Sequence, residues 1–266
     1  MNSKVGFIGC GNMGKAMIAG IVDSGIVTPE NIMTSCRTAA TLEQMTKEYG
    51  VTTTHNNKEV AESSDFIFLA VKPQYYEEVI AEIKDYITED KILVSIAPGK
   101  SLAWREDRVG MPCKVIRTMP NTPSMVKEGM MGICANDKVT PEEIKQLQEI
   151  CNGFSRTDLV PEHLMDVVTA VSGSSPAYVY MFIEAMADAA VEGGMPRNQA
   201  YTFAAQAVLG SAKMVLETGI HPGKLKDNVC SPGGTTIQAV RVLEEKGMRG
   251  AVMDAMKACL DKARTI

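Results

Sequence analysis

The segment Lys4–Gly14, which reads KVGFIGCGNMG, decides the fold of the first half of this chain. Its apolar residues Val5–Ile8 predict a short buried strand, and the glycines that follow have the spacing GxGxxG. Gly9 permits a tight turn, Gly11 lets the backbone approach a pyrophosphate, and Gly14 lets the next helix pack closely on the strand. A strand, this loop and a helix in succession predict a dinucleotide-binding unit of the Rossmann type. The alternative is a glycine-rich turn without a ligand.

The end of the second predicted strand, Asn31–Ser35, bears on which dinucleotide is bound. Enzymes that bind NAD usually place Asp or Glu there, where the carboxylate binds the ribose 2′-hydroxyl. This chain has Ser35, Cys36 and Arg37 instead. Because no acid would repel a 2′-phosphate and an arginine fork could bind one, the sequence favours NADPH, with NADH as the second choice. The alternative is that Arg37 is a solvated loop charge.

Strands and helices alternate through the rest of residues 1–160. The continuous apolar run 65–71 is typical of a buried parallel strand, and 92–96 and 114–118 are predicted to be further buried strands. In a doubly wound sheet the ligand binds beyond the carboxyl ends of the strands. We therefore expect the segments that directly follow these runs to face the cofactor.

From residue 161 to residue 266 the pattern changes to successive helices. The segment Thr202–Leu216 is apolar or small nearly all round, so it should be buried on several sides. The second half alone cannot easily enclose such a helix, and we expect a homodimer with interleaved helical domains. The predicted fold class is thus α/β: an N-terminal Rossmann-type domain with a mostly parallel sheet (1–160), then an all-α dimerisation domain (161–266).

The second half also contains the segment Asn228–Leu243, which reads NVCSPGGTTIQAVRVL and begins as a polar loop before it turns into a helix. Pro232 and two glycines end the preceding element, and a helix with apolar residues at helical spacing begins at the two threonines. Such a segment presents free backbone N–H groups, two hydroxyls and the positive end of a helix dipole. It can bind a carboxylate or a phosphate. The alternative is an ordinary capped helix.

Composition excludes several classes of protein. The formal net charge of −5 disfavours non-specific binding to nucleic acid or to a membrane surface. Apolar runs stay well short of the roughly 20 residues that a membrane span needs. The seven cysteines are scattered without a CxxC pair and only three histidines are present, so we expect neither a disulfide framework nor a metal site. The N-terminal apolar stretch is too short for a signal peptide, and a cytoplasmic location is expected.

The run His221–Gly247, HPGKLKDNVCSPGGTTIQAVRVLEEKG, resembles the signature of the pyrroline-5-carboxylate reductase family. The resemblance implies NADPH-dependent reduction of 1-pyrroline-5-carboxylate to L-proline, the last step of proline biosynthesis. In that family this loop holds the carboxylate and ring of the substrate. The positions carried over by the match are Asn228, Ser231, Gly234, Thr235 and Thr236.

The segments 70–73 and 119–123 also resemble this family, in which the first lies along the nicotinamide side of the cofactor. Asn57 matches a position that meets the adenine-side ribose, with Asn56 as the alternative because this chain has two asparagines in succession. Lys72 is open to two interpretations, a catalytic acid or, more often for a lysine before proline, a structural charge. The expected cofactor-binding residues are Gly9, Gly11, Asn12, Met13, Gly14, Ser35, Arg37, Asn57, Ala70, Val71, Lys72, Pro73, Ala97 and Asn121.

The segment Val171–Tyr178, VSGSSPAY, is similar to the family's Ser-Gly-Ser-Gly-Pro-Ala-Tyr, with Ser175 where glycine is usual. A second departure is Met248, where the family usually has Phe. Glu162 matches a family position near the substrate, and an equal alternative is a first-turn acid that favours the helix dipole. The resemblance implies a dimer, and larger rings of dimers occur in the family.

The chemistry implied is hydride transfer to a cyclic imine, with one proton on the nitrogen. We expect the hydroxyl of Thr236 to bind the ring nitrogen. A dedicated acid is unnecessary if the imine arrives protonated, and His163 and His221 are better explained as surface and loop residues. A related hydroxyacid dehydrogenase would use a helix lysine, but the predicted helix 176–193 contains none. A nucleotide sensor on the same fold would not need the polar loop.

Overall fold

The computed structural model describes residues 2–265, which form two compact units. The first unit comprises the chain up to Ser174 together with the segment from Leu260 onward, and the second is Ser175–Cys259. Residues 161–174 therefore pack with the first unit. The predicted division of roles at residue 160 stays a prediction.

The first unit contains one eight-stranded sheet with the strand order β3-β2-β1-β4-β5-β6-β7-β8. Neighbouring strands are parallel except β6 and β7, which are antiparallel. The predicted mostly parallel Rossmann-type sheet is thereby confirmed. The strands are β1 (Val5–Ile8), β2 (Ile32–Ser35), β3 (Thr52–Thr54), β4 (Phe66–Leu69), β5 (Ile92–Ser95), β6 (Lys114–Met119), β7 (Gly129–Ala135) and β8 (Ser155–Leu159).

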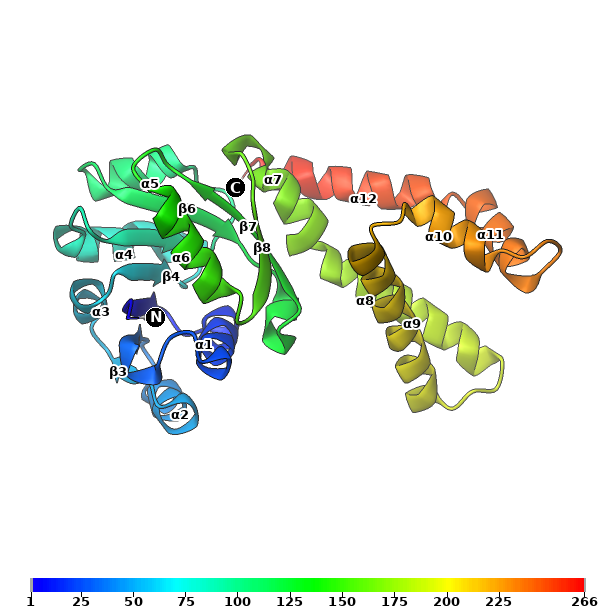
Figure 1. The fold of residues 1–266 in the computed structure, drawn as a ribbon, viewed down its shortest axis with the longest axis horizontal. Helices are drawn as coiled ribbons and strands as arrows, with labels where there is room; N and C mark the ends of the chain where they lie inside the picture. Colours follow the sequence, from blue (N-terminus) through cyan, green and yellow to red (C-terminus); the bar gives the residue numbers. More distant parts are fainter. Residues whose placement is uncertain (1, 266) are drawn as a thin grey trace. The chain divides into compact units, whose positions relative to one another are not determined.

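Helices cover both faces of this sheet, as Figure 1 shows. The alternation of side chains along β1 sends Phe7 to one face and Ile8 to the other, where each joins a separate apolar core. The Phe7 ring stacks on that of Phe68 at 4.7 Å between centroids. The helices are α1 (Asn12–Ser24), α2 (Ala39–Tyr49), α3 (Asn57–Ser63), α4 (Tyr76–Ile83), α5 (Leu102–Val109), α6 (Pro141–Cys151) and α7 (Met165–Val168). Of these, α1, α2 and α6 contribute to the core that contains Phe7, and α3, α4, α5 and α7 to the other.

The strand order reverses between β1 and β4, which places a crevice at the carboxyl ends of these strands. Gly9 follows β1 there with φ +96°, and its N–H donates a 2.9 Å hydrogen bond to the carbonyl of Ser35 at the end of β2. A Cβ at Gly9 would lie 2.8 Å from the backbone of Ala70, so only glycine fits. The ends of β1, β2 and β4 are thus tied together around one loop.

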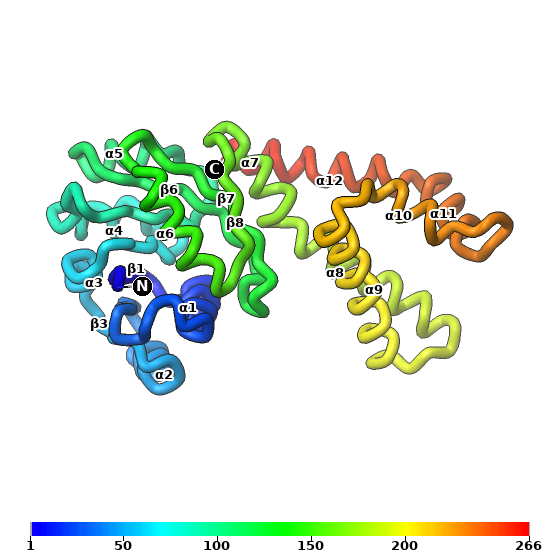
Figure 2. Tube along the Cα trace, viewed as in Figure 1, coloured from blue at the N-terminus to red at the C-terminus, as the bar shows by residue number. Residues whose placement is uncertain are grey.

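The second unit is helical, as predicted. Its first two helices, α8 (Ser175–Glu192) and α9 (Arg197–Thr218), form a hairpin that packs through Ala187, Ala200 and Ala204 (Figure 2). It continues with α10 (Pro222–Val229), α11 (Thr235–Glu245) and the first part of α12 (Met248–Ala263). The apolar side chains of α9 are largely exposed in a single chain, with Phe203 at 60% and Leu216 at 66% exposure. One chain therefore does not bury this helix on several sides.

Candidate active site

The glycine loop of the first unit has the geometry of an anion site. Helix α1 begins after Gly11, and no side chain of residues 2–265 hydrogen-bonds to this end of the helix. The first N–H groups of the helix therefore remain available to a ligand. A Cβ built on Gly11 meets nothing within 4 Å, whereas one on Gly14 would lie 2.9 Å from the carbonyl oxygen of Gly9. There is no space for a side chain at Gly9 or Gly14, whereas the space next to Gly11 is empty. A pyrophosphate could therefore approach the backbone at Gly11.

A pocket of about 630 Å³ extends from this loop along the ends of β1, β2 and β4. It brings together eight of the predicted cofactor residues: Gly9, Gly11, Ser35, Arg37, Asn57, Ala70, Val71 and Lys72. Three more, Asn12, Met13 and Gly14, form the first turn of α1 beside it. Pro73 directly follows Lys72, while Ala97 and Asn121 follow β5 and β6. An extended nucleotide fits a pocket with this composition and position.

Asn57, and not its neighbour Asn56, faces this pocket. The side chain of Asn56 accepts a 3.0 Å hydrogen bond from the N–H of Lys58 and so caps helix α3. Asn57 accepts a 2.7 Å hydrogen bond from the buried hydroxyl of Ser35. The two asparagines that the sequence left as alternatives therefore have different structural roles.

Among the lining residues that sequence reasoning missed are His55, Tyr75, Glu78 and Glu82. Glu78 forms an ion pair with Arg37 at 3.4 Å, and the Arg37 guanidinium lies 5.0 Å from the centroid of the Tyr75 ring. Glu82 accepts a 2.7 Å hydrogen bond from Asn57. The spacing of three and four residues between Tyr75, Glu78 and Glu82 was the signal in the sequence that could have shown a shared face.

The loop that contains Ala97 is held by a buried arginine that the sequence did not single out. Arg105 on α5 is 0% exposed and donates hydrogen bonds to the Ser95 hydroxyl at 2.6 Å, to the Ser101 carbonyl at 3.0 Å and to the Ala97 carbonyl at 3.3 Å. Its guanidinium also lies 5.8 Å from the centroid of the Tyr76 ring. Burial lowers the pKa of Arg105 to about 10. The Arg105 side chain thus holds the carboxyl end of β5 and the loop after it through these hydrogen bonds.

Asn121, another predicted site residue of the first unit, also makes hydrogen bonds within the protein. Asn121 donates at 3.1 Å to the carbonyl of Ser172, which lies in a single π-helical turn (η6, Thr169–Gly173), and accepts at 2.9 Å from the N–H of Met130. Turns of this type often occur at functional sites.

Glu162, at the start of a short 3₁₀ helix (η5, Glu162–Leu164), accepts a 2.7 Å hydrogen bond from the N–H of Leu102. Its carboxylate thereby stabilises the start of α5. It also lies 3.7 Å from the nearly buried guanidinium of Arg117. These contacts belong to the first unit and bear on its packing.

The polar loop of the second unit lies between α10 and α11. Gly233 has φ +68°, and the N–H of Gly234 donates a 3.0 Å hydrogen bond to the carbonyl of Ser231. Gly234 precedes α11, and no described side chain hydrogen-bonds to this end of the helix. The first N–H groups of α11 and the hydroxyls of Thr235 and Thr236 are thus presented together. Five of the six predicted substrate residues lie in this stretch, and Glu162 lies in the other unit.

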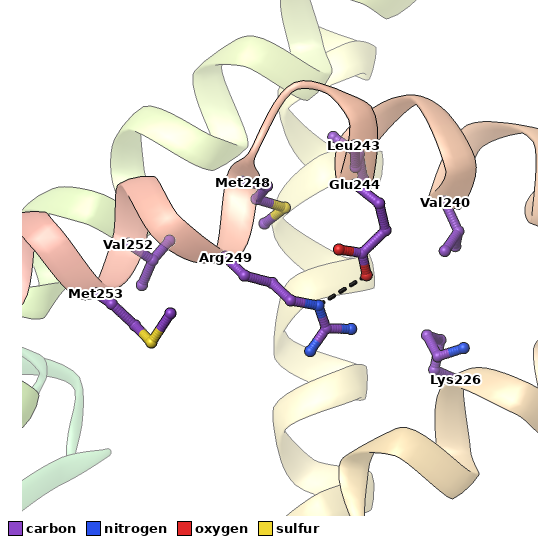
Figure 3. Close-up of a pocket in the computed structure, with 8 residues that line it drawn as sticks. All are labelled: Lys226, Val240, Leu243, Glu244, Met248, Arg249, Val252 and Met253. Carbon is purple, nitrogen blue, oxygen red and sulfur yellow. Dashed lines mark hydrogen bonds and ion pairs between the residues drawn. The ribbon is translucent and has the colours of Figure 1, made fainter.

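The second unit also contains a largely apolar hollow of about 590 Å³ (Figure 3). It is lined by residues from α10, α11 and α12, namely Lys226, Val240, Leu243, Glu244, Met248, Arg249, Val252 and Met253. Arg249 donates a 2.7 Å hydrogen bond to Glu244 at its polar side (Figure 3). Met248, one of the two residues at which the sequence departs from the family pattern, lines this hollow.

Residues 2–265 contain no group of three or more His, Cys, Asp or Glu side chains that could hold a metal ion. Among the same residues, none of the helices combines the length and the apolar character required to cross a bilayer.

Comparison with known proteins covers the whole chain. Residues 162–266 match the family model of the pyrroline-5-carboxylate reductase dimerisation domain, and residues 4–99 match that of coenzyme F420-dependent NADP oxidoreductases. Pyrroline-5-carboxylate reductase of Escherichia coli is 51% identical over 266 residues, covering 100% of this chain and 99% of the relative. The enzyme of the same name from Methanosarcina acetivorans is 45% identical, covering 100% and 98%.

Solved structures agree. The pyrroline-5-carboxylate reductase of Coxiella burnetii superposes with a TM-score of 0.94 at 34% identity, covering 100% of this chain and 98% of the other. The pyrroline carboxylate reductase of Plasmodium falciparum, with NADP bound, superposes with a TM-score of 0.89 at 35% identity, covering 99% and 98%.

Proposed function

The chain belongs to the pyrroline-5-carboxylate reductase family, and from this membership we propose that it reduces 1-pyrroline-5-carboxylate to L-proline with NADPH. The observation that carries the proposal is identity of 51% along the full length, with the polar loop before α11 intact. The reaction completes proline biosynthesis.

We assign cofactor binding to the first unit. The N–H groups at Gly11 and along the first turn of α1 hold the pyrophosphate, and Ser35, Arg37 and Asn57 hold the adenine-side ribose with its 2′-phosphate. Ala70–Pro73, Ala97 and Asn121 line the approach to the nicotinamide. When bound, NADPH supplies a hydride.

We assign substrate binding to the polar loop. The N–H groups at Gly234, Thr235 and Thr236 bind the substrate carboxylate, because the start of α11 carries the positive end of the helix dipole. The Thr236 hydroxyl binds the ring nitrogen, while Ser231, Asn228 and Glu162 complete the set of substrate-binding residues. The imine carbon gains the hydride and the nitrogen carries one proton, so no dedicated acid is required once the imine is protonated.

The match to a dimerisation model supports an oligomer, and we propose a homodimer with interleaved helical domains spanning residues 161–266. The exposed apolar side chains of α9 and the hollow of Figure 3 offer surface for a second copy to cover. A ring of dimers is a further arrangement, and light scattering of the purified protein distinguishes the two. The expected cytoplasmic location stays a prediction that cell fractionation tests.

The test of function is direct. Purified protein is mixed with 1-pyrroline-5-carboxylate, NADPH absorbance is followed with NADH in parallel, and proline is measured. We expect NADPH oxidation with one proline formed per NADPH consumed. If nucleotide binds but the imine is not reduced, the proposed substrate is wrong and a sensor or another reductase becomes the better interpretation.

A further inference from the structure

The nucleotide pocket contains two carboxylates that the end of β2 does not supply. Glu78 and Glu82 lie four residues apart on α4 and both line the pocket with Arg37. Positions four apart share one face of a helix. The acid that NAD-binding enzymes place after the second strand is thus replaced here by a pair of acids from a helix later in the chain.

Glu78 forms an ion pair with Arg37, the residue proposed to bind the 2′-phosphate. Its carboxylate lies 3.4 Å from Arg37, and the two side chains are 66% and 75% exposed. An ion pair this exposed is weak and rearranges easily. A 2′-phosphate that binds Arg37 must therefore compete with the Glu78 carboxylate, and the two negative charges repel each other.

Glu82 contacts Asn57, the residue assigned to the adenine-side ribose, through the side-chain amide of that asparagine. Ser35 donates to Asn57, and Asn57 donates to Glu82, both at 2.7 Å. The half-buried Glu82 carboxylate thus orients the asparagine that faces the pocket. A carboxylate beside the asparagine assigned to the ribose favours a 2′-hydroxyl over a dianionic 2′-phosphate.

The pocket is lined by two cationic side chains, Arg37 and Lys72, and by two anionic ones, Glu78 and Glu82. His55 bonds through Nδ1 to the carbonyl of Cys36 at 2.9 Å. The arginine alone would make the pocket selective for a phosphate, and the two acids oppose it.

We propose that Glu78 and Glu82 are specificity-determining residues that reduce the preference for NADPH over NADH. The inference rests on the proposed use of NADPH and deepens it by naming the groups that limit it. Glu78 weakens phosphate binding by holding Arg37, and Glu82 by its charge beside Asn57.

The test measures nucleotide binding without turnover. The full-length protein is titrated calorimetrically with 2′,5′-ADP and with 5′-AMP, which differ only in the 2′-phosphate. We expect Glu78→Gln to bind 2′,5′-ADP about two- to fivefold more tightly, the range that an exposed ion pair supports, with 5′-AMP nearly unchanged. Glu82→Gln, which keeps an oxygen for Asn57, shifts the ratio in the same direction.

Glu77→Gln is the matched control. It removes the same charge from the same helix, but Glu77 pairs with Arg108 at 3.1 Å and does not line the pocket. A shift with this variant equal to that of Glu78→Gln would overturn the proposal as a general charge effect. An unchanged ratio of the two affinities in both Glu78→Gln and Glu82→Gln would also overturn it.

The double variant Arg37→Met with Glu78→Gln tests whether Glu78 affects phosphate binding through Arg37. If Glu78 acts through Arg37, the gain seen in Glu78→Gln disappears in this background. Calorimetry separates this proposal from the proposed reaction, because a protein that binds 2′,5′-ADP selectively but leaves the imine unreduced contradicts only the reaction. A wild-type protein that binds neither nucleotide overturns the inference.

Discussion

The guanidinium of Arg105 donates a 2.6 Å hydrogen bond to the hydroxyl of Ser95, at the carboxyl end of β5. Arg105 is buried without a carboxylate partner at hydrogen-bond distance among the described residues, and carbonyl oxygens of the following loop accept its remaining bonds. A charge in this position stabilises a loop conformation through hydrogen bonds.

Replacing Arg105 by Met should therefore destabilise the first unit. The substitution removes the donor to the buried Ser95 hydroxyl and the Ala97 carbonyl, and we expect the free energy of unfolding to fall by about 2–4 kcal/mol in urea titration at fixed protein concentration. Arg108→Met, on the exposed side of the same helix, should change it by less than about 1 kcal/mol. Equal losses in both variants would show that the buried bonds are not what stabilises the loop.

Alanine substitutions at Gly11 and Gly14 should have different effects, the first on nucleotide affinity and the second on stability. In Gly11→Ala the added methyl enters open pocket space, so nucleotide affinity should fall by about tenfold or more, while stability changes by at most about 1 kcal/mol. In Gly14→Ala the methyl meets the Gly9 carbonyl, and stability should fall by roughly 1–3 kcal/mol. Calorimetric titration and urea unfolding of both variants provide the check; normal nucleotide binding by Gly11→Ala would place the pyrophosphate elsewhere.

Thr236→Val keeps the shape of the side chain and removes its hydroxyl. If that hydroxyl binds the ring nitrogen, kcat with saturating NADPH should fall about 10- to 100-fold, while the KM for NADPH stays unchanged. Thr235→Val is the matched variant, and we expect it to raise the KM for the substrate instead. Unchanged turnover by Thr236→Val would remove this residue from the catalytic role.

Glu162→Gln tests whether this carboxylate meets the substrate as well as the start of α5. The amide oxygen can still accept from the N–H of Leu102, so we expect a stability loss below about 1 kcal/mol. The lost charge should raise the KM for pyrroline-5-carboxylate severalfold. Glu162→Ala, which loses the hydrogen bond too, should be less stable. A normal KM in Glu162→Gln would leave this residue with only its structural contacts.

Cysteine reactivity reports on the nucleotide pocket. Cys36 lines it and is half-buried, whereas burial raises the pKa of Cys113 to about 11. At pH 8 we expect iodoacetamide to label Cys36, 2′,5′-ADP to slow this labelling, and Cys113 to stay unmodified, as measured by mass spectrometry. Labelling of Cys36 at the same rate with saturating nucleotide would argue against binding in this pocket.

The raised pKa of the Cys113 thiol predicts that the stability of the protein depends on pH. Because the folded-state pKa of Cys113 lies above its ordinary value of 9.0, its contribution to stability is complete below pH 9 and is lost as the pH rises toward 11. Cys113→Val should flatten this part of the stability profile in urea unfolding between pH 8 and pH 11. An unchanged slope would mean that other groups dominate there.

Much of the first unit could be predicted because its signals are local. The apolar runs that predicted strands became β1, β4, β5 and β6, and the glycine spacing placed the turn after β1. Arg37 could be proposed from the absence of an acid after the second strand. The resemblance favoured Asn57 but left Asn56 as an alternative, because capping and pocket-facing positions differ only in where each side chain points.

By itself, the sequence determined the alternation of elements, the glycine loop and the polar loop before α11, since periodicity and glycine geometry act over a few residues. The tertiary structure alone decided that Glu78 would meet Arg37, 41 residues earlier in the chain, and that Arg105 would support the end of β5. Contacts of this kind depend on how helices pack against a sheet. That packing brings side chains from distant segments together, and no local pattern encodes it.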